Sequence, residues 1–387
     1  MNLSRHFKRR GIVEGFFGPL WSMSHRAAIF QFGAARGMNT YVYAPKDDPY
    51  HRKRWRQPYP KAKWQALVDL VGIAKKHEID FVYGFHPGKG LCFSDPKPIK
   101  LLLEKARRFY DIGVRTFAVL FDDIPSRLEH GADRKRFEGS LARAEAVWLY
   151  EILHRQPAAW KNVEWWLCPS YYSEDELLPR TFGAFEPNFL ESLDTYLPLE
   201  IPCFWTGPSV VSQTITLAHI RKIAKRLNRP LLLWDNYPVN DLSMRNEMHL
   251  GPLTGRDPRL PQQVYGYFNN PLLQEALSFI PLATCFDYAV KPTNYDPESS
   301  WQRIVTEFFG TQALSHWRAI RAFCDQQTQG KLSRSMSASR KARLQKARDY
   351  ISANLGTHWA AELRPWHESL KRYLARQKSS REIPVEE

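Results

Sequence analysis

Eight short and almost continuously apolar runs constrain the fold of this 387-residue chain more than any other feature. Such runs are typical of parallel strands buried on both faces, because alternating apolar and polar residues are expected only where one face meets water. The eight predicted strands occupy residues 11–18, 40–45, 80–87, 115–123, 163–172, 201–208, 230–236 and 264–271.

The segments between these runs have the apolar periodicity of amphipathic helices, clearest at residues 24–37, 61–78 and 95–113. Residues 242–261 are rich in Gly, Pro and Arg, and we expect a long excursion without a regular helix. Eight strand–helix units in about 280 residues match the size of a (β/α)8 barrel. The sequence therefore predicts an α/β fold with a TIM-type barrel over residues 1–297. A doubly wound sheet is the second choice, because the first turn is not rich in glycine.

No strand pattern follows residue 298, and three helices are expected at residues 301–324, 337–355 and 359–377. We expect residues 298–387 to form a basic C-terminal helical bundle that packs on the barrel or pairs two subunits as a homodimer. Residues 331–387 contain 13 Lys or Arg and 6 Asp or Glu, within a net charge of +15 for the chain. A basic balance raises nucleic acid as a partner, but no nucleic-acid motif accompanies it, so a solvated surface is favoured.

The composition also bears on the cellular location of the protein. No run approaches the ~18 consecutive apolar residues of a membrane span, and no apolar segment follows the basic first residues as in a secretory signal. The five cysteines are odd in number and form no CxxC pair. This spacing argues against a zinc site or a disulfide framework, and it favours a cytoplasmic location.

Polar and aromatic residues gather at the ends of the predicted strands, and in a barrel these ends form one rim. They are Glu14, Gly15, Lys46, Asp47, Asp48, Asp122, Asp123, Tyr171, Tyr172, Trp234, Asp235, Asn236, Asn269 and Asn270. Carboxylates and amides bind hydroxyl groups, and aromatic faces pack on the apolar faces of a pyranose. The rim therefore predicts a sugar-binding pocket.

Each of these residues alone also has an ordinary structural explanation. Two adjacent aspartates usually cap a helix or form a turn, and Lys46 could simply pair with Asp47 or Asp48 on the surface. Trp234 could be a core residue. The coincidence of such residues on different strands, where the fold requires a site, favours the functional interpretation.

The adjacent Asp122 and Asp123 can face one ligand only where the strand gives way to a turn, and Ile124-Pro125 supplies that break. Two carboxylates held close together resist ionising at the same time, which leaves one group able to donate a proton. The ordinary glycosidase mechanisms place two carboxylates on opposite sides of the bond, about 5 Å or about 6.5–9.5 Å apart. Adjacent carboxylates instead suit a mechanism in which the substrate's own 2-acetamido oxygen is the nucleophile.

Eight motifs occur in order over residues 11–290: GIVEGFFG, NTYVYAPKDDPYHRKRWR, FAVLFDDI, CPSYY, FWTGPSVVS, LLLWDNYPVND, HLGP and NNP. In this order they resemble glycoside hydrolase family 84, which contains the β-N-acetylglucosaminidases that remove O-linked GlcNAc from proteins. The resemblance implies a retaining exo-β-N-acetylglucosaminidase that forms an oxazoline and needs no metal or cofactor. It also implies that Asp122 orients the acetamido group and that Asp123 is the general acid/base.

The resemblance further implies a set of sugar-binding residues: Gly15, Lys46, Tyr172, Trp234, Asn236, Asp241 and Asn270. The chain departs from the family at Phe17, where relatives often have tyrosine. Tyr172 is chosen over Tyr171 by its spacing from Cys168.

The expected function is a hydrolase that acts on GlcNAc-bearing glycoconjugates or glycoproteins. The sequence leaves two alternatives open. The net charge of +15 would favour an enzyme acting on an anionic polysaccharide such as hyaluronan. A non-catalytic carbohydrate binder is the other alternative, although it would not need both Asp122 and Asp123.

Overall fold

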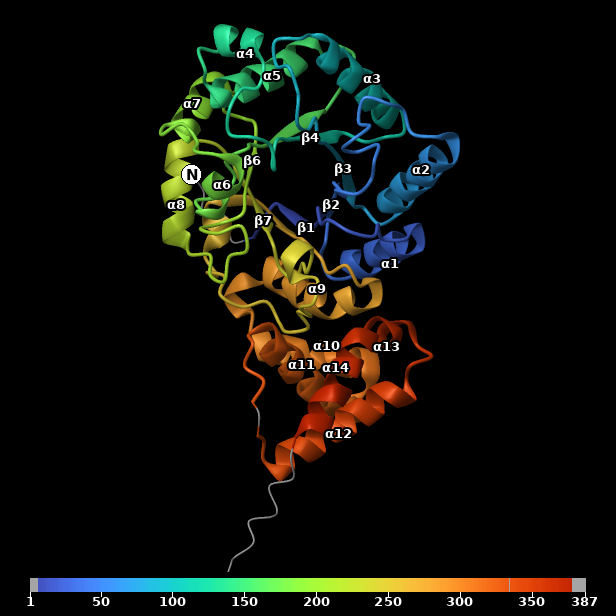
Figure 1. The fold of residues 1–387 in the computed structure, drawn as a ribbon. Coiled ribbons are helices and arrows are strands. Elements are labelled where there is room, and N and C mark those ends of the chain that lie inside the picture. Colours follow the sequence, from blue (N-terminus) through green and yellow to red (C-terminus); the bar gives the residue numbers. More distant parts are fainter. Residues whose placement is uncertain (1–5, 334, 378–387) are drawn as a thin grey trace, which may run out of the picture.

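The computed structural model describes residues 6–333 and 335–377, and its centre is a closed barrel of eight parallel strands (Figure 1). The strands pair in chain order, and β1 closes the barrel against β8. They are β1 Arg9–Glu14, β2 Thr40–Tyr43, β3 Asp80–Phe85, β4 Thr116–Leu120, β5 Glu164–Cys168, β6 Cys203–Trp205, β7 Leu231–Asp235 and β8 Val264–Asn269. The predicted (β/α)8 fold is confirmed, and each strand overlaps one predicted apolar run.

Helices surround the barrel. They are α1 Met23–Ala34, α2 Lys61–Lys76, α3 Lys97–Asp111, α4 Gly131–Arg136, α5 Leu141–Arg155, α6 Leu177–Phe182, α7 Phe189–Tyr196, α8 Leu217–Leu227 and α9 Glu275–Val290. Helices α1 to α8 lie in the connections from β1 to β7, and α9 follows β8. Between β7 and β8 the described chain forms only two 3-10 turns, Leu242–Met244 and Leu260–Gln262. The predicted excursion over residues 242–261 is therefore present.

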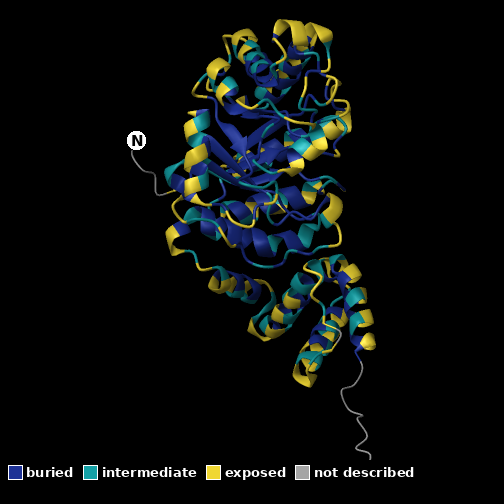
Figure 2. Cartoon of the chain, turned by 60° about the vertical axis from the view of Figure 1, so that its left-hand side comes forward, coloured by how far each residue is buried: buried dark blue, intermediate teal, exposed yellow. Residues whose placement is uncertain are grey.

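The strands are buried on both faces, as their apolar sequences require (Figure 2). Successive residues point to opposite sides of the sheet, so that Ile12 packs toward the helices and Val13 toward the barrel interior. The interior is filled by one residue or more from every strand, including Val42, Trp166 and Phe268. A filled interior leaves a cavity only beyond the ends of the strands.

The C-terminal part consists of α10 Pro297–Phe309, α11 Leu314–Thr328, α12 Ala338–Ala353, α13 His358–Glu362 and α14 Arg364–Arg376. The prediction of one helix over residues 301–324 was wrong, because Gly310 has a φ of 80° and separates α10 from α11. A second break separates α13 from α14 at Leu363, two residues before Pro365. Proline in the first turn of α14 is compatible with a helix start but not with a continuous helix.

Helix α9 joins the two parts of the molecule. Leu282, Phe286 and Ala289 belong to the core between the barrel and its helices, whereas Leu277 and Ile280 belong to a second core with α10–α14. The boundary between residues 297 and 298 stays a prediction, and the outer ends of the two predicted domains, residues 1–5 and 378–387, lie outside the described residues.

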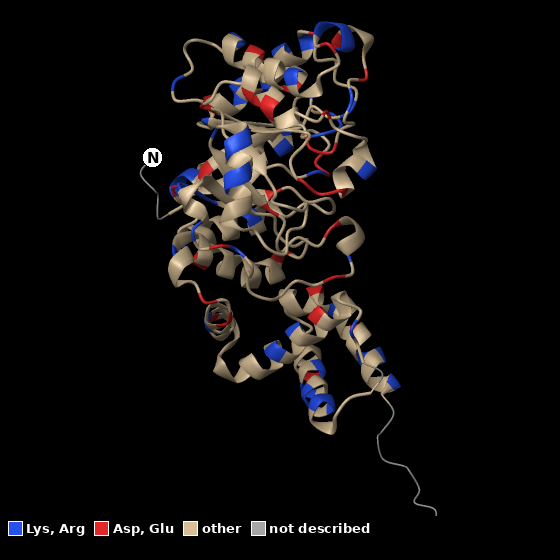
Figure 3. Cartoon of the chain, turned by 90° about the vertical axis from the view of Figure 1, so that its left-hand side faces the viewer, with Lys and Arg blue, Asp and Glu red and all other residues tan. Residues whose placement is uncertain are grey.

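Lys and Arg residues, coloured blue, occur along the helices of the barrel and of the C-terminal part (Figure 3). All five cysteines are free thiols. No helix in the described part of the chain is both long enough and apolar enough to cross a lipid bilayer.

Candidate active site

A cavity of about 190 Å³ lies at the carboxyl ends of the strands. All nine residues that the sequence predicted for the site line this cavity. They are Gly15, Lys46, Asp122, Asp123, Tyr172, Trp234, Asn236, Asp241 and Asn270. They come from the carboxyl ends of six different strands and the segments that follow them, so the barrel brings together residues far apart in the sequence.

The turn after β4 directs Asp122 and Asp123 into the same cavity. The strand ends at Leu120, and Asp123 has a φ of 63°, a left-handed conformation that Asp tolerates better than most residues. This backbone conformation removes the strand alternation that would otherwise send the two side chains to opposite faces.

Only one of the two oxygens of the Asp122 carboxylate has a hydrogen-bond partner among the described residues. The Lys46 ammonium binds its Oδ2, and Oδ1 is buried without a hydrogen-bond partner among the described residues. His86 binds the backbone carbonyl of Asp122 through Nε2 at 2.9 Å. Burial, with Lys46 and His51 nearby, holds the pKa of His86 well below its usual range, so a neutral imidazole donates this hydrogen bond.

Asp123 has a different partner. The Tyr172 hydroxyl donates to Oδ1 of Asp123 at 3.0 Å, and Lys46 Nζ lies 3.8 Å from Oδ2. Burial and the neighbouring carboxylates raise the pKa of Tyr172 well above its usual range, so the hydroxyl keeps its proton. Tyr171 turns away from the cavity and packs against Phe185, with ring centroids 5.0 Å apart. The structure thus places Tyr172, and not Tyr171, beside the acidic pair.

Two asparagines and a tryptophan form a connected wall of the cavity. Asn236 Oδ1 accepts from Trp234 Nε1 and from Asn270 Nδ2, each at 2.9 Å. Asn270 Oδ1 in turn accepts from the backbone N–H of Gly15 at 3.2 Å. Because each amide has a fixed partner, the wall presents its polar groups in one orientation.

Gly15 lies directly against the Trp234 ring. A Cβ atom at this position would lie 2.1 Å from Cζ2 of Trp234, which is far inside contact distance. Glycine is therefore required here by close approach, and the indole can form the cavity wall only because residue 15 has no side chain.

Asp241 lies in the segment after β7, which also contains Asn236. Its Oδ2 accepts from the backbone N–H of Phe17 at 2.7 Å, which ties the β7 and β1 loops together. Burial raises the pKa of Asp241, opposed by the Phe17 hydrogen bond and reinforced by Asp123. The site therefore carries three carboxyl groups and one ammonium.

Comparison with known proteins identifies the family of this chain. A sequence model described as beta-N-acetylglucosaminidase matches residues 10–325. The chain belongs to this family. The family is one of glycoside hydrolases, and the resemblance to family 84 seen in the motifs is confirmed.

Named relatives agree with the family. The chain is 33% identical over 276 residues to the protein O-GlcNAcases of Rattus norvegicus and Mus musculus. The match covers 71% of this chain, and the chain spans only 29% of the length of these curated relatives.

Two solved structures have the same fold. A mutant of the Thermobaculum terrenum O-GlcNAc hydrolase is 31% identical with a TM-score of 0.85, over 95% of this chain and 82% of the other. CpGH84B is 27% identical with a TM-score of 0.77, over 95% of this chain and 67% of the other.

Several polar residues at the rim of this β-N-acetylglucosaminidase fold have structural partners instead of facing the cavity. Glu14 binds Arg26 and Tyr41, and Asp235 binds Arg256 and Tyr267. Asp48 accepts from the hydroxyl groups of two tyrosines, Asp47 accepts from Gly18 N, and Asn269 donates to the carbonyl of Tyr237. The ordinary explanation, a satisfied structural group, therefore holds for these five.

The sequence marked Phe17 only as a departure from the family and did not predict the other apolar residues that line the cavity. Those residues are Cys168, Leu177, Val210, Val211, Val239, Leu242 and Met244. Most lie in loops without periodicity, and an apolar loop residue gives no signal that separates a binding wall from ordinary packing. Among the residues of the described segments, no group of three or more His, Cys, Asp or Glu side chains is placed to hold a metal ion.

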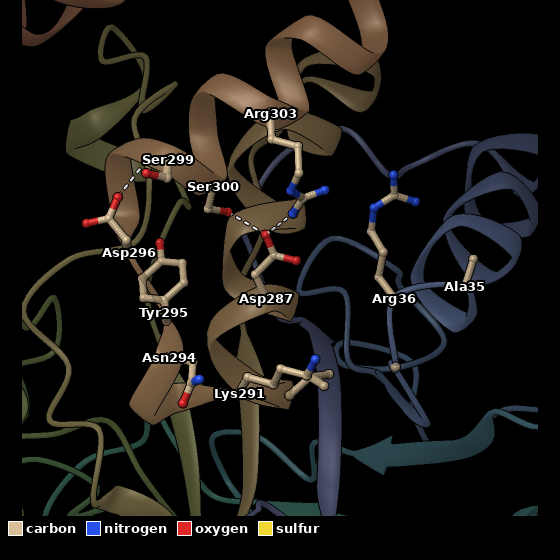
Figure 4. Close-up of a pocket in the computed structure, with 12 residues that line it drawn as sticks. Ala35, Arg36, Asp287, Lys291, Asn294, Tyr295, Asp296, Ser299, Ser300 and Arg303 are labelled. Carbon is tan, nitrogen blue, oxygen red and sulfur yellow. Dashed lines mark hydrogen bonds and ion pairs between the residues drawn. The ribbon is translucent and has the colours of Figure 1, made fainter.

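A larger cavity, about 750 Å³, lies where α1 and α9 end, beside α10 (Figure 4). Its acidic groups are already paired, since Asp287 binds Ser300 and Arg303 and Asp296 caps α10 through the backbone N–H of Ser299. The carboxyl ends of the barrel helices lie on the same face as the amino ends of the strands. Residues on this face of a barrel contribute to stability, whereas active sites lie on the opposite face. The smaller cavity is therefore the candidate active site of this family member.

Proposed function

We propose that this protein is a retaining exo-β-N-acetylglucosaminidase that uses the acetamido group of its substrate as the nucleophile. The observation that carries the proposal is that the two adjacent aspartates of one turn have different hydrogen-bond partners. Asp122 has one oxygen fixed by Lys46 and one buried oxygen without a hydrogen-bond partner among the described residues, while the adjacent Asp123 is held separately by Tyr172.

In the first step the acetamido N–H of a bound GlcNAc donates to Oδ1 of Asp122, and the acetamido oxygen attacks the anomeric carbon. The bond from this carbon to the leaving oxygen breaks as the oxazoline ring closes. Asp123 gives its proton to the leaving oxygen. The anionic, buried Asp122 stabilises the positive charge that develops on the acetamido nitrogen.

In the second step Asp123, now a carboxylate, takes a proton from a water molecule that attacks the anomeric carbon. The oxazoline opens, the acetamido group is restored, and two inversions leave the anomeric configuration retained. The Lys46 ammonium keeps the Asp122 carboxylate in place through both steps.

We propose GlcNAc linked to protein as the natural substrate. Support comes from the named activity of the rat and mouse relatives, although the chain corresponds to only part of their length. The cavity of about 190 Å³ is suited to one sugar residue, which fits removal of a single terminal GlcNAc.

The proposal is tested with 4-nitrophenyl β-GlcNAc, the corresponding β-glucoside and a bicyclic thiazoline that mimics the oxazoline. We expect hydrolysis of the GlcNAc substrate, none of the glucoside, and tight inhibition by the thiazoline, since transition-state mimics bind more tightly than substrates. Hydrolysis of both substrates, or indifference to the thiazoline, would refute participation of the acetamido group.

The net charge of +15 supports an anionic GlcNAc polysaccharide as a second candidate substrate. Hydrolysis that requires long hyaluronan and disappears at moderate salt would favour it, because screening weakens long-range attraction between charges.

A further inference from the structure

Glu145 is a fully buried carboxyl group outside the candidate site. It lies on α5, the residue is 0% exposed, and no Lys, Arg or His of the described residues is among the groups that shift its pKa. A buried carboxyl group without a cation is costly and needs an explanation.

The hydrogen bonds of Glu145 go to the backbone of the segment that follows β5. The N–H of Ser170 lies 3.2 Å from Oε2 and 3.4 Å from Oε1. Ser170 is two residues before Tyr172, and the carbonyl of Tyr172 accepts from the N–H of Thr206 at 3.0 Å. The short segment between them is thus fixed at one end by α5 and at the other by the loop after β6.

The same segment carries the hydroxyl group that holds Asp123. Tyr172 reaches Asp123 at 3.0 Å, so the place of the Tyr172 ring decides where the acid/base carboxyl group stands. Reaction rates are sensitive to displacements of catalytic groups of about 1 Å.

We propose that Glu145 is a positioning residue for Asp123, acting through the backbone of Ser170 and the hydroxyl of Tyr172. The inference rests on the proposed function, in which Asp123 protonates the leaving oxygen. It adds a residue from an outer helix, with no contact to the cavity, to the groups that determine acid catalysis.

The surroundings of Glu145 keep it uncharged near neutral pH. Its titratable neighbours are Glu186 and the thiols of Cys168 and Cys203, and burial raises the pKa of Glu145 to about 8. A glutamine side chain has nearly the same shape, is neutral, and retains an oxygen that can accept from Ser170. Glu145→Gln is therefore the matched conservative variant.

The test compares Glu145→Ala, Glu145→Gln and the control Ile152→Val on two aryl β-GlcNAc substrates. Ile152 is buried on the same helix and lies outside the proposed chain of contacts. The substrates carry a good leaving group, 4-nitrophenol, and a poor one, 4-methoxyphenol.

We expect Glu145→Ala to lower kcat/KM about tenfold or more for the poor leaving group and much less for the good one, because only the former needs full protonation. Glu145→Gln and Ile152→Val should behave like the wild type at pH 7. In an Asp123→Ala background, Glu145→Ala should cause no further loss, since the two changes act through the same group.

Equal losses on both substrates, or a loss in the double variant equal to the product of the single losses, would overturn the proposal. Should Glu145→Ala not fold, Glu145→Asp replaces it, and its smaller loss must show the same dependence on the leaving group. Inactivity of the wild type on both substrates would instead refute the proposed function.

Discussion

The Lys46 ammonium binds one oxygen of Asp122, and the other oxygen of the same carboxylate is buried without a hydrogen-bond partner among the described residues. A buried carboxylate normally has both oxygens satisfied. The unpartnered Oδ1 has the chemistry to accept one N–H from a ligand, and the buried lysine compensates the charge of the group that does so.

Replacing Asp122 with Asn should abolish most activity regardless of the leaving group. The amide keeps the shape of the side chain but removes the negative charge that stabilises the developing oxazolinium. We expect kcat to fall about 10²–10⁴-fold on both 4-nitrophenyl and 4-methoxyphenyl β-GlcNAc. Steady-state kinetics on the two substrates check this, and a loss confined to the poorer leaving group would assign Asp122 the role of the acid.

Replacing Asp123 with Ala should give the complementary result. A good leaving group departs with little protonation, so the loss in kcat should be about 10²-fold or more for 4-methoxyphenol and clearly smaller for 4-nitrophenol. The pH profile should also lose the limb that belongs to the acid. Equal losses for the two leaving groups would show that the proton comes from another residue.

Gly15→Ala tests the close approach to Trp234. The added methyl group must displace the indole, and we expect kcat/KM to fall about 10- to 100-fold with weaker binding of the thiazoline. Gly72→Ala is the matched control, because Gly72 lies on α2 with open space around it. The control should keep full activity and gain about 0.5–1 kcal/mol of stability, since alanine is favoured over glycine within a helix.

Glu145→Gln should change how stability depends on pH. Glu145 retains its proton in the folded state up to about pH 8, against about 4.5 for its ordinary value. The protonated Glu145 therefore contributes fully to the free energy of unfolding below pH 4.5, and this contribution is lost as pH rises through 8. The reason is that the unfolded chain releases the proton more easily than the folded chain does. Glutamine has no such dependence.

Between pH 5 and pH 8.5 the melting temperature of the wild type should fall relative to Glu145→Gln by at least about 2 °C, roughly the effect of 1 kcal/mol in a domain of a few hundred residues. Differential scanning fluorimetry across this range measures the difference. Glu200→Gln, at an exposed position, serves as the control. Parallel curves for the wild type and Glu145→Gln would contradict a protonated buried carboxyl group.

The barrel was predictable because strands buried on both faces leave an unambiguous apolar pattern, and the strand ends of such a fold share one rim. Which rim residues face the cavity was harder to predict from composition. Asp122 and Asp235 both follow apolar strands, yet one lines the cavity and the other forms a buried pair with Arg256. That outcome depends on partners distant in sequence, and no local pattern encodes them.

The role of Glu145 could not be predicted for the same reason. Glu145 is one glutamate within an amphipathic helix, and glutamate in such a helix is usually exposed to solvent. Only the packing of α5 behind β5 brings it to the N–H of Ser170. The break at Gly310 is different, since glycine at a helix end is a recognisable signal that the long apolar pattern of residues 301–324 concealed.

The position of α9 has a practical consequence for anyone who wishes to work with the barrel alone. One stripe of this helix closes the barrel and the other, with Leu277 and Ile280, is covered by the C-terminal helices. A shortened chain that stops before α10 would present that second stripe to water and invite aggregation. Excising the hydrolase module thus requires redesigning the outer side of its last helix with polar side chains.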